Sequence, residues 1–266
     1  PTDEDKIPDF ISQMIAEHEQ NEAVEMARTA NLYDHQKNKT VNEYVQKIYS
    51  STGVSVRNYV ASNNKIASNF FRRLNTQRCA YSLGNGVTFA SDKDTDGKVK
   101  QDGGTKAKLG KTFDTELYRA GYLALIHGVS FVFFNFDHIH VFPLTEFVPL
   151  WDENDGTLRA GLRYWRIDGT KPTIAVLYTE DGYRRFKSKS GYARFEKDGD
   201  LRAYKQTISK APADAEPEVI AEENYSRLPI VPLWGSRLHQ STLVGLQQSI
   251  DSYDLIRSGF ANDLQD

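Results

Sequence analysis

The sequence contains one cysteine, Cys79, and no long apolar run. A single cysteine excludes an internal disulfide and is typical of a protein in a reducing compartment, so we expect a buried structural thiol. No segment approaches the roughly 20 apolar residues of a membrane-spanning helix, and the polar residues Pro1 to Lys6 contain no signal-peptide core. These absences favour a soluble globular protein without a membrane partner.

An excess of positive charge is also absent, because 33 Lys and Arg residues stand against 36 Asp and Glu residues. Tight DNA binding depends on Lys and Arg side chains that neutralise phosphates, so a net charge of −3 argues against a DNA binder of that kind. Residues 242–266 hold four aspartates and one arginine, which equals the whole negative excess. That acidity fits a passage through which DNA slides, and it fits an ordinary solvated helix equally well.

Motifs that could bind an ion or a nucleotide are incomplete. Asp92, Asp94 and Asp96 match the first half of a calcium-binding loop, but Gly103 stands where the loop needs a bidentate glutamate, so a solvated loop is the preferred interpretation. Lys111 lies in a Gly-Lys-Thr triplet that resembles the end of a phosphate-binding loop. The first glycine of that motif is missing.

Two further features are better explained by a structural role than by ligand binding. Thr112 of the Gly-Lys-Thr triplet precedes a predicted helix, and we expect its side chain to cap that helix. His138 and His140 share one face of a predicted strand, but two ligands do not make a metal site, and we expect a pair at the edge of a hairpin. The sequence therefore predicts no catalytic, cofactor-binding or metal-binding residue.

Helical periodicity marks the first half of the chain. It predicts helices over residues 8–30, 41–48 and 113–126. The polar stretches 31–40 and 91–104 have no apolar period and are expected to be loops.

From residue 129 the apolar spacing becomes that of strands, and glycine-bearing turns such as Asp168-Gly169 and Asp181-Gly182 separate the apolar segments. This pattern is typical of an antiparallel meander. The expected strands are 129–136, 138–142, 147–151, 158–167, 173–178, 183–186, 193–196, 201–208, 219–221 and 230–233. The fold class is therefore α+β.

A final helix is expected from about Thr242. Its apolar residues form a continuous stripe made of Leu243, Leu246, Ile250, Tyr253, Ile256, Phe260 and Leu264. Small residues on the other faces would let neighbouring helices approach closely.

Residues 63–89 are the most informative segment. Asn63 and Asn64 can cap a helix, and Ile66, Phe70 and Leu74 recur at the spacing of one buried helical face. The arginines expected late in this helix, where cations complement its dipole, are Arg72, Arg73 and Arg78.

The same segment ends in a joint between helix and strand. Tyr81-Ser82-Leu83 is followed by a turn at Gly84-Asn85-Gly86 and an extended Val87-Thr88-Phe89. Because the joint contains no nucleophile, base or ligand cluster, it predicts an architectural role.

This joint resembles one in the portal proteins of tailed bacteriophages, in the branch typical of phages with long flexible tails. A helix that begins near Asn-Asn-Lys-Ile and ends in Tyr-x-Leu-Gly-(Lys/Asn)-x-(Val/Ile)-Thr-(Phe/Tyr) is a hallmark of that family. Further segments resemble the family in its own order: 113–152, Leu162–Trp165, Val176–Thr179, Leu228–Leu233 and Ser249–Asp254 with Ser258, Asn262 and Asp263. The loop that starts at Trp234-Gly235-Ser236 departs from the family, which usually has an Asn-Asn pair there.

The resemblance implies an α+β wing over residues 1–235 and the beginning of a stem helix over 236–266, with the rest of the stem, the clip and the crown beyond Asp266. Tyr81–Phe89 would fix the joint, and Leu243–Leu264 would pack the stem.

The resemblance also implies a function. The family forms a ring, usually a dodecamer, at one capsid vertex of the virion, after assembly in the host cytoplasm. The ring seats the terminase motor, passes double-stranded DNA without sequence-specific binding, and holds the head–tail adaptors, with no active site or cofactor of its own. Two alternatives stay open: another virion protein such as a minor capsid or adaptor protein, and an enzyme domain that uses Lys111 or the three aspartates Asp92, Asp94 and Asp96.

Overall fold

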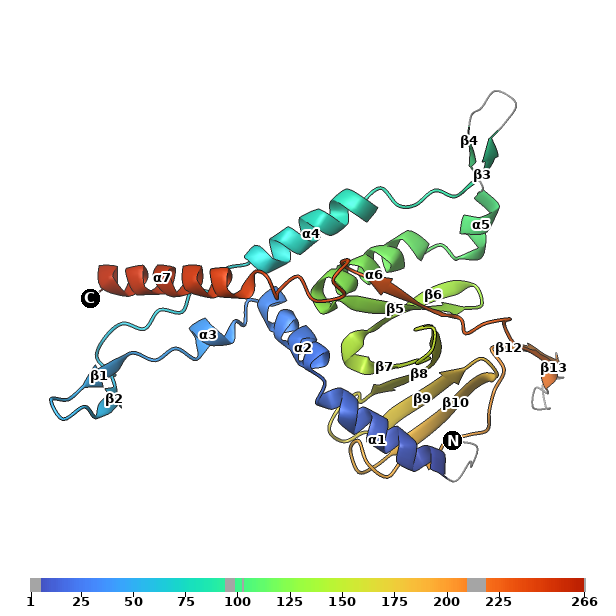
Figure 1. The fold of residues 1–266 in the computed structure, drawn as a ribbon, viewed down its shortest axis with the longest axis horizontal. Coiled ribbons are helices and arrows are strands. Elements are labelled where there is room, and N and C mark those ends of the chain that lie inside the picture. The colour runs from blue at the N-terminus through green and yellow to red at the C-terminus, as the bar shows by residue number, and fades with distance from the viewer. Residues whose placement is uncertain (1–5, 94–98, 102, 210–218, 266) are drawn as a thin grey trace.

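The computed structural model describes residues 6–93, 99–101, 103–209 and 219–265 (Figure 1). The helices are α1 (Ile7–Glu19), α2 (Glu22–Asp34), α3 (Lys39–Asn42), α4 (Phe70–Leu83), α5 (Gly103–Lys108), α6 (Phe113–His127) and α7 (Gln247–Gln265), with a 3₁₀ turn, η2, at Leu144–Glu146. The strands are β1 (Lys47–Tyr49), β2 (Ser55–Arg57), β3 (Ala90–Lys93), β4 (Val99–Gln101), β5 (Val129–Asn135), β6 (His138–Pro143), β7 (Phe147–Trp151), β8 (Leu158–Trp165), β9 (Thr173–Thr179), β10 (Gly182–Ser188), β11 (Glu196–Lys197), β12 (Lys205–Ile208), β13 (Val219–Glu223) and β14 (Ile230–Trp234). The mixture of helices and antiparallel sheets confirms the α+β prediction.

A five-stranded antiparallel meander forms one layer of the body. Its order is β11-β10-β9-β8-β7, so each strand pairs with its neighbour in sequence, as the turn pattern predicts. Successive residues of β9 point to opposite faces: Ile174, Val176 and Tyr178 belong to one core cluster, while Ala175 belongs to another. The meander is therefore covered on both faces.

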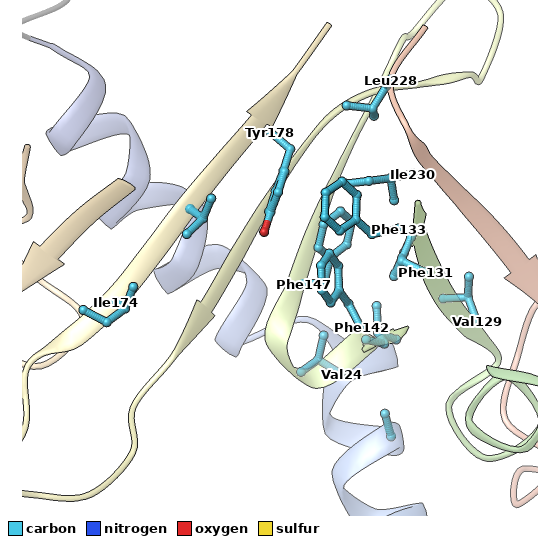
Figure 2. Packing of buried hydrophobic residues seen from close by; sticks show 13 residues of the cluster. Val24, Val129, Phe131, Phe133, Phe142, Phe147, Ile174, Tyr178, Leu228 and Ile230 are labelled. Atoms are coloured by element: carbon cyan, nitrogen blue, oxygen red, sulfur yellow. The ribbon is translucent and has the colours of Figure 1, made fainter. Parts of the chain in front are cut away.

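A smaller sheet with the order β14-β5-β6 covers one of these faces. β14 returns from far along the chain to pair with β5, with Ile230 opposite Phe133 and Trp234 opposite Val129. Figure 2 shows the aromatic core between the layers, and the rings of Phe131 and Phe147 lie 4.4 Å apart between their centroids. Helix α1 covers the other face of the meander through side chains that include Ile11 and Ile15.

The N-terminal helical pattern is the first correction. Residues 8–30 do not form one helix: α1 ends at Glu19, and α2 begins after Asn21, whose side chain accepts a hydrogen bond from the Ala23 amide (2.9 Å). This N-cap restarts the helix because it satisfies an orphan N–H group. Residues 31–40 are not wholly a loop, since α2 continues to Asp34 and buries Tyr33.

Other boundaries also differ from the prediction. The helix expected over 41–48 is replaced by the single turn of α3 and by strand β1. Part of the expected loop 91–104 pairs as β3 and β4, and α5 follows it. The last helix begins at Gln247 because residues 242–246 form tighter turns, with hydrogen bonds such as Leu246 N–H to Leu243 O (2.9 Å). The helix over 113–126 and most strands lie where the sequence pattern places them.

Candidate functional site

The segment before α4 is extended. Residues 63–69, called the strap below, precede a helix that begins at Phe70, so the prediction that Asn63 and Asn64 cap a helix is wrong. Figure 1 shows the chain between β2 and α4 passing beside α7. The strap is held there by hydrogen bonds to α7.

Every second residue of the strap donates its backbone N–H group to a side chain of α7. The bonds run from Asn64 to Asn262 Oδ1 (2.6 Å), from Ile66 to Ser258 Oγ (3.0 Å) and from Ser68 to Asp254 Oδ1 (3.0 Å). These three bonds are called the ladder below.

The ladder is possible because two different repeats have nearly equal lengths. Two residues of extended chain advance about 6.6 Å, and four residues of an α-helix advance about 6.0 Å. A residue at every fourth position of α7 therefore stays in register with every second amide of an antiparallel strap. The mismatch of roughly 0.6 Å per step is small enough for the two steps that separate the three bonds.

The ladder face of α7 is polar and buried. Its buried residues are Ile250, Asp254, Ser258 and Asn262, and Asp254 is fully inaccessible. The Asp254 carboxylate also accepts a hydrogen bond from Asn38 Nδ2 (2.7 Å). Buried polar groups need such partners, so this face can bind only chain segments that supply donors.

Asp251 fixes two further elements to the start of α7. Its carboxylate accepts hydrogen bonds from Tyr33 Oη of α2 (2.5 Å) and from Thr40 Oγ1 of α3 (3.0 Å). Burial of the phenol, together with the adjacent Asp251 carboxylate, raises the pKa of Tyr33 to about 12. Helix α7 is thus attached to α2 and α3 through Asp251, and to the strap through the three acceptors of the ladder.

The opposite face of α7 is apolar and exposed. Leu243 and Ile250 are buried in a cluster with Phe71 and Ile126, and Leu246 packs against it partly buried, but the last four residues of the predicted stripe are open to solvent. The exposed side chains are Tyr253 (42%), Ile256 (71%), Phe260 (64%) and Leu264 (74%). The residues of the stripe therefore differ in burial. The four exposed residues, Tyr253, Ile256, Phe260 and Leu264, are together called the α7 apolar face below.

The buried face predicted for α4 is wrong. Phe70 and Leu74 are exposed, and the residues that α4 buries are Phe71, Asn75 and Cys79. Because the helix begins at Phe70, Arg72 and Arg73 lie in its first turn and not near its end. The exposed ring of Phe70 instead packs on Tyr253 of the α7 apolar face, with 5.0 Å between centroids.

Cys79 is buried, as expected from the sequence. Its thiol donates a hydrogen bond to the carbonyl oxygen of Tyr118 (3.3 Å), and burial raises its pKa. A raised pKa keeps the thiol protonated, which disfavours a nucleophilic role.

The joint after α4 contains the predicted turn. Gly86 has a φ of +72°, and an added Cβ would lie 2.8 Å from the Asp114 carboxyl carbon, so the turn favours glycine there. Asp114 Oδ1 accepts a hydrogen bond from the Val87 amide (3.2 Å), which anchors the joint to α6. The next strand begins at Ala90, so residues 87–89 do not belong to it, and Tyr81 is exposed.

The loop before α7, which departs from the family pattern, closes the end of α6. Gly235 donates its N–H to Gly128 O (3.0 Å), and Thr242 donates its N–H to Leu125 O (3.0 Å). A Cβ at Gly235 would lie 2.0 Å from the Ala124 carbonyl oxygen, so the close approach requires glycine. The loop thus satisfies a carbonyl group that the helix end leaves free.

The motifs with possible chemistry form no catalytic site among the described residues. Asp94 and Asp96 lie outside those residues, and within them no group of three His, Cys, Asp or Glu side chains could hold a metal ion. His138 and His140 face each other on the β5–β6 hairpin with 3.0 Å between their Nε2 atoms, as a pair.

The prediction that the Thr112 side chain caps a helix is wrong. The residue occupies the N-cap position of α6, but its side chain makes no cap hydrogen bond. Its φ of −91° and ψ of 6° differ from the extended backbone that usually lets an N-cap side chain reach the following amides.

Comparison with known proteins agrees with the architecture. The model of the family "Phage portal protein, SPP1 Gp6-like" matches residues 12–266. The chain belongs to this family of phage portal proteins. No curated protein matches it closely enough to be counted as a relative.

Membership bears on the alternatives that the sequence left open. A portal protein is a structural component of the virion, and the family assembles as an oligomeric ring with capsid and terminase partners. This favours the portal over a minor capsid or adaptor protein and over an enzyme domain. No helix in the described part of the chain is long and apolar enough to cross a membrane.

The ladder joins two segments that carried the family resemblance separately. Asn64 and Ile66 come from the Asn-Asn-Lys-Ile motif, while Asp254, Ser258 and Asn262 come from the last motif. Sequence reasoning missed this contact because it treated each motif as a local structure. The available signal was the four-residue spacing of short polar side chains on a helix otherwise marked by its apolar stripe.

Proposed function

We propose that this portal protein forms a closed ring, usually a dodecamer in the family, at one vertex of a phage or prophage capsid. The ring would pass double-stranded DNA inward and outward without reading its sequence. It would also seat the terminase motor and the head–tail adaptors. Assembly would take place in the host cytoplasm.

The observation that carries this proposal is the α7 apolar face. Four large side chains stay exposed on a helix whose opposite face is fixed by the ladder. An exposed apolar surface of this kind marks an interaction site. In a ring each copy would bury this face against its neighbour, as expected for Leu243–Leu264.

Within this proposal, residues 1–235 form the wing and residues 236–266 begin the stem. We propose no catalytic residue, cofactor or metal site, because the family is structural and the ATPase belongs to the terminase. Calorimetry with calcium, magnesium and ATP should give no binding and no turnover. Turnover that requires Lys111 would favour the enzyme hypothesis instead.

Negative-stain microscopy and mass photometry test the ring directly. The full-length protein should form closed rings with an axial hole. The double variant Ile256→Glu and Phe260→Glu should reduce ring formation at least tenfold, because each introduced carboxylate would have to be buried in the interface. Its melting temperature as a monomer should stay unchanged, since both side chains are exposed in the isolated chain.

The matched control replaces Ile167, an exposed residue after β8, with glutamate. This variant should assemble as the unchanged protein does. A full-length protein that stays monomeric at all concentrations would disprove the proposal.

A further inference from the structure

A hairpin of unusual exposure lies between α3 and the strap. Residues 44–60, called the arm below, contain β1 and β2, which pair with each other and whose six residues are all exposed. Figure 1 shows the arm projecting from the molecule below the C-terminal part of α7, away from the meander. A two-stranded hairpin alone is only marginally stable in water.

The arm exposes apolar side chains that a solvated hairpin does not need. Ile48 and Val56 are direct cross-strand partners, so they share one face of the hairpin. The large exposed hydrophobic residues of the arm are Tyr44, Ile48, Tyr49, Val54, Val56, Tyr59 and Val60, and their exposures range from 48% to 95%. Apolar residues gathered in this way mark a binding surface.

The base of the arm is held in place. The Asn58 amide donates to Gln46 O (2.9 Å), which closes the hairpin at its root. On either side the chain is attached to α7, through Asn38 to Asp254 and through Asn64 to Asn262. These hydrogen bonds therefore fix the root of the arm relative to α7 and to its apolar face.

We propose that the arm packs on the adjacent copy of this chain, where Ile48 and Val56 become buried. This inference rests on the proposed ring and goes beyond it, because it names a second contact that holds neighbours together. A closed ring with head-to-tail contacts needs two different surfaces on each subunit, and the arm is distinct from the α7 apolar face. Both outer edges of the hairpin also leave backbone groups available for pairing with another strand.

Charge supports a second copy as the occupant. Lys47 and Arg57 are the charged residues of the arm, which contains no acidic residue, whereas the whole chain has a net charge of −3. The residues outside the arm therefore sum to a net charge of −5, opposite in sign to the arm. Complementary charge favours approach and register between two copies.

The test removes the two strands of the arm and the turn between them without moving its root. Residues 47–57 are replaced by Asn-Gly, a dipeptide that favours a tight turn and can join Gln46 to Asn58. A second variant combines Ile48→Asp with Val56→Asp, and its matched control combines Ile167→Asp with Leu238→Asp, two residues that are also exposed. Ring assembly is measured against protein concentration.

Both arm variants should need at least a tenfold higher concentration for half-assembly, with the monomer melting temperature unchanged. The control pair should assemble as the unchanged protein does. In addition, a photoreactive p-benzoylphenylalanine in place of Tyr49 should form adducts between two copies in assembled rings and none in monomers.

Each other outcome contradicts the inference. Rings that form equally well without the arm would overturn it and leave the proposed function standing. An adduct of position 49 with DNA, or with another virion protein only, would assign the arm to a different partner. If the unchanged protein never assembles, the inference and the proposed ring both fail.

Discussion

Asp254 joins three segments that are far apart in the sequence. Its two carboxylate oxygens accept hydrogen bonds from the Ser68 amide and from the Asn38 side chain, and the residue is fully buried. In the unfolded chain both donors form hydrogen bonds with water. Burying them is favourable only if both carboxylate oxygens accept hydrogen bonds in the folded protein. This side chain is where the strap, α3 and α7 meet.

Asp254→Asn should therefore lower the free energy of unfolding by about 1–3 kcal/mol, because an amide offers one acceptor oxygen where two donors point. Urea unfolding measures the loss. The control is Asp263→Asn, an exposed change on the same helix that should shift stability by less than about 0.5 kcal/mol. Equal losses for the two variants would mean that the pairing of Asp254 contributes nothing specific.

Two buried histidines predict how stability depends on pH. Burial lowers the pKa of His127 to about 4, and burial also lowers that of His18 to about 4. An unfolded histidine has a pKa of about 6.5, so between these values the unfolded chain binds more protons. Stability should be full above about pH 6.5 and should fall as the pH decreases towards 4.

His127→Gln should flatten this decline, because one of the two groups no longer titrates. The slope of unfolding free energy against pH, obtained from urea curves between pH 7.5 and 4.5, measures the effect. A His127 variant with an unchanged slope would rule out a contribution from that residue.

Among the elements, α7 shows that an apolar stripe is not always the side of a helix that its own chain buries. Its apolar stripe is present, but most of it faces solvent, and the intramolecular contact uses the polar face. A helical stripe is usually read as the buried side. Here the buried side is decided by a strap whose amides need acceptors.

The ladder predicts alternating protection along the strap. The amides of Ile66 and Ser68 are hydrogen-bonded to α7 and should exchange with solvent at least tenfold more slowly than the Lys65 amide, which belongs to an exposed residue. Hydrogen exchange followed by NMR measures these rates. Uniform rates from residue 64 to residue 68 would show that the strap is not held as described.

Proline substitution tests the same element by removing one donor. Ile66→Pro should destabilise the protein by about 1–3 kcal/mol more than Ile66→Ala, which measures the side-chain share alone. Ala67→Pro is the matched control, because its amide is not one of the three donors of the ladder and an extended backbone tolerates proline. Equal effects of the two prolines, measured by urea unfolding, would contradict the ladder.

For the whole molecule, negative charge limits what the protein can do with DNA. A chain with a net charge of −3 lacks the excess of Lys and Arg that tight binding to phosphates needs. We expect duplex DNA to bind no more tightly than about 10⁻⁵ M at physiological salt, and two unrelated sequences to bind alike. Fluorescence anisotropy with labelled duplexes measures both quantities.

A useful control is Asp263→Lys, which reverses an exposed charge on α7 and should raise the affinity for DNA slightly. Submicromolar binding of one sequence by the unchanged protein would contradict a passive passage. An unchanged affinity of the variant would indicate that this part of α7 does not face the DNA.

The sequence by itself determined the local structure of the body. The two-residue alternation and glycine turns placed β5 to β10, and the helical period placed α6, because these patterns depend on residues near one another. The ordered motifs also determined the family, since each is a short run of residues.

Only the tertiary structure decided which faces are buried. The strap is extended, and α7 turns its apolar face outward, because Asp254, Ser258 and Asn262 accept hydrogen bonds from residues nearly two hundred positions earlier in the chain. A local pattern contains no information about such a partner. The buried face of α7 is the one whose side chains accept hydrogen bonds from the strap. Those partners are known only when the two distant segments have come together.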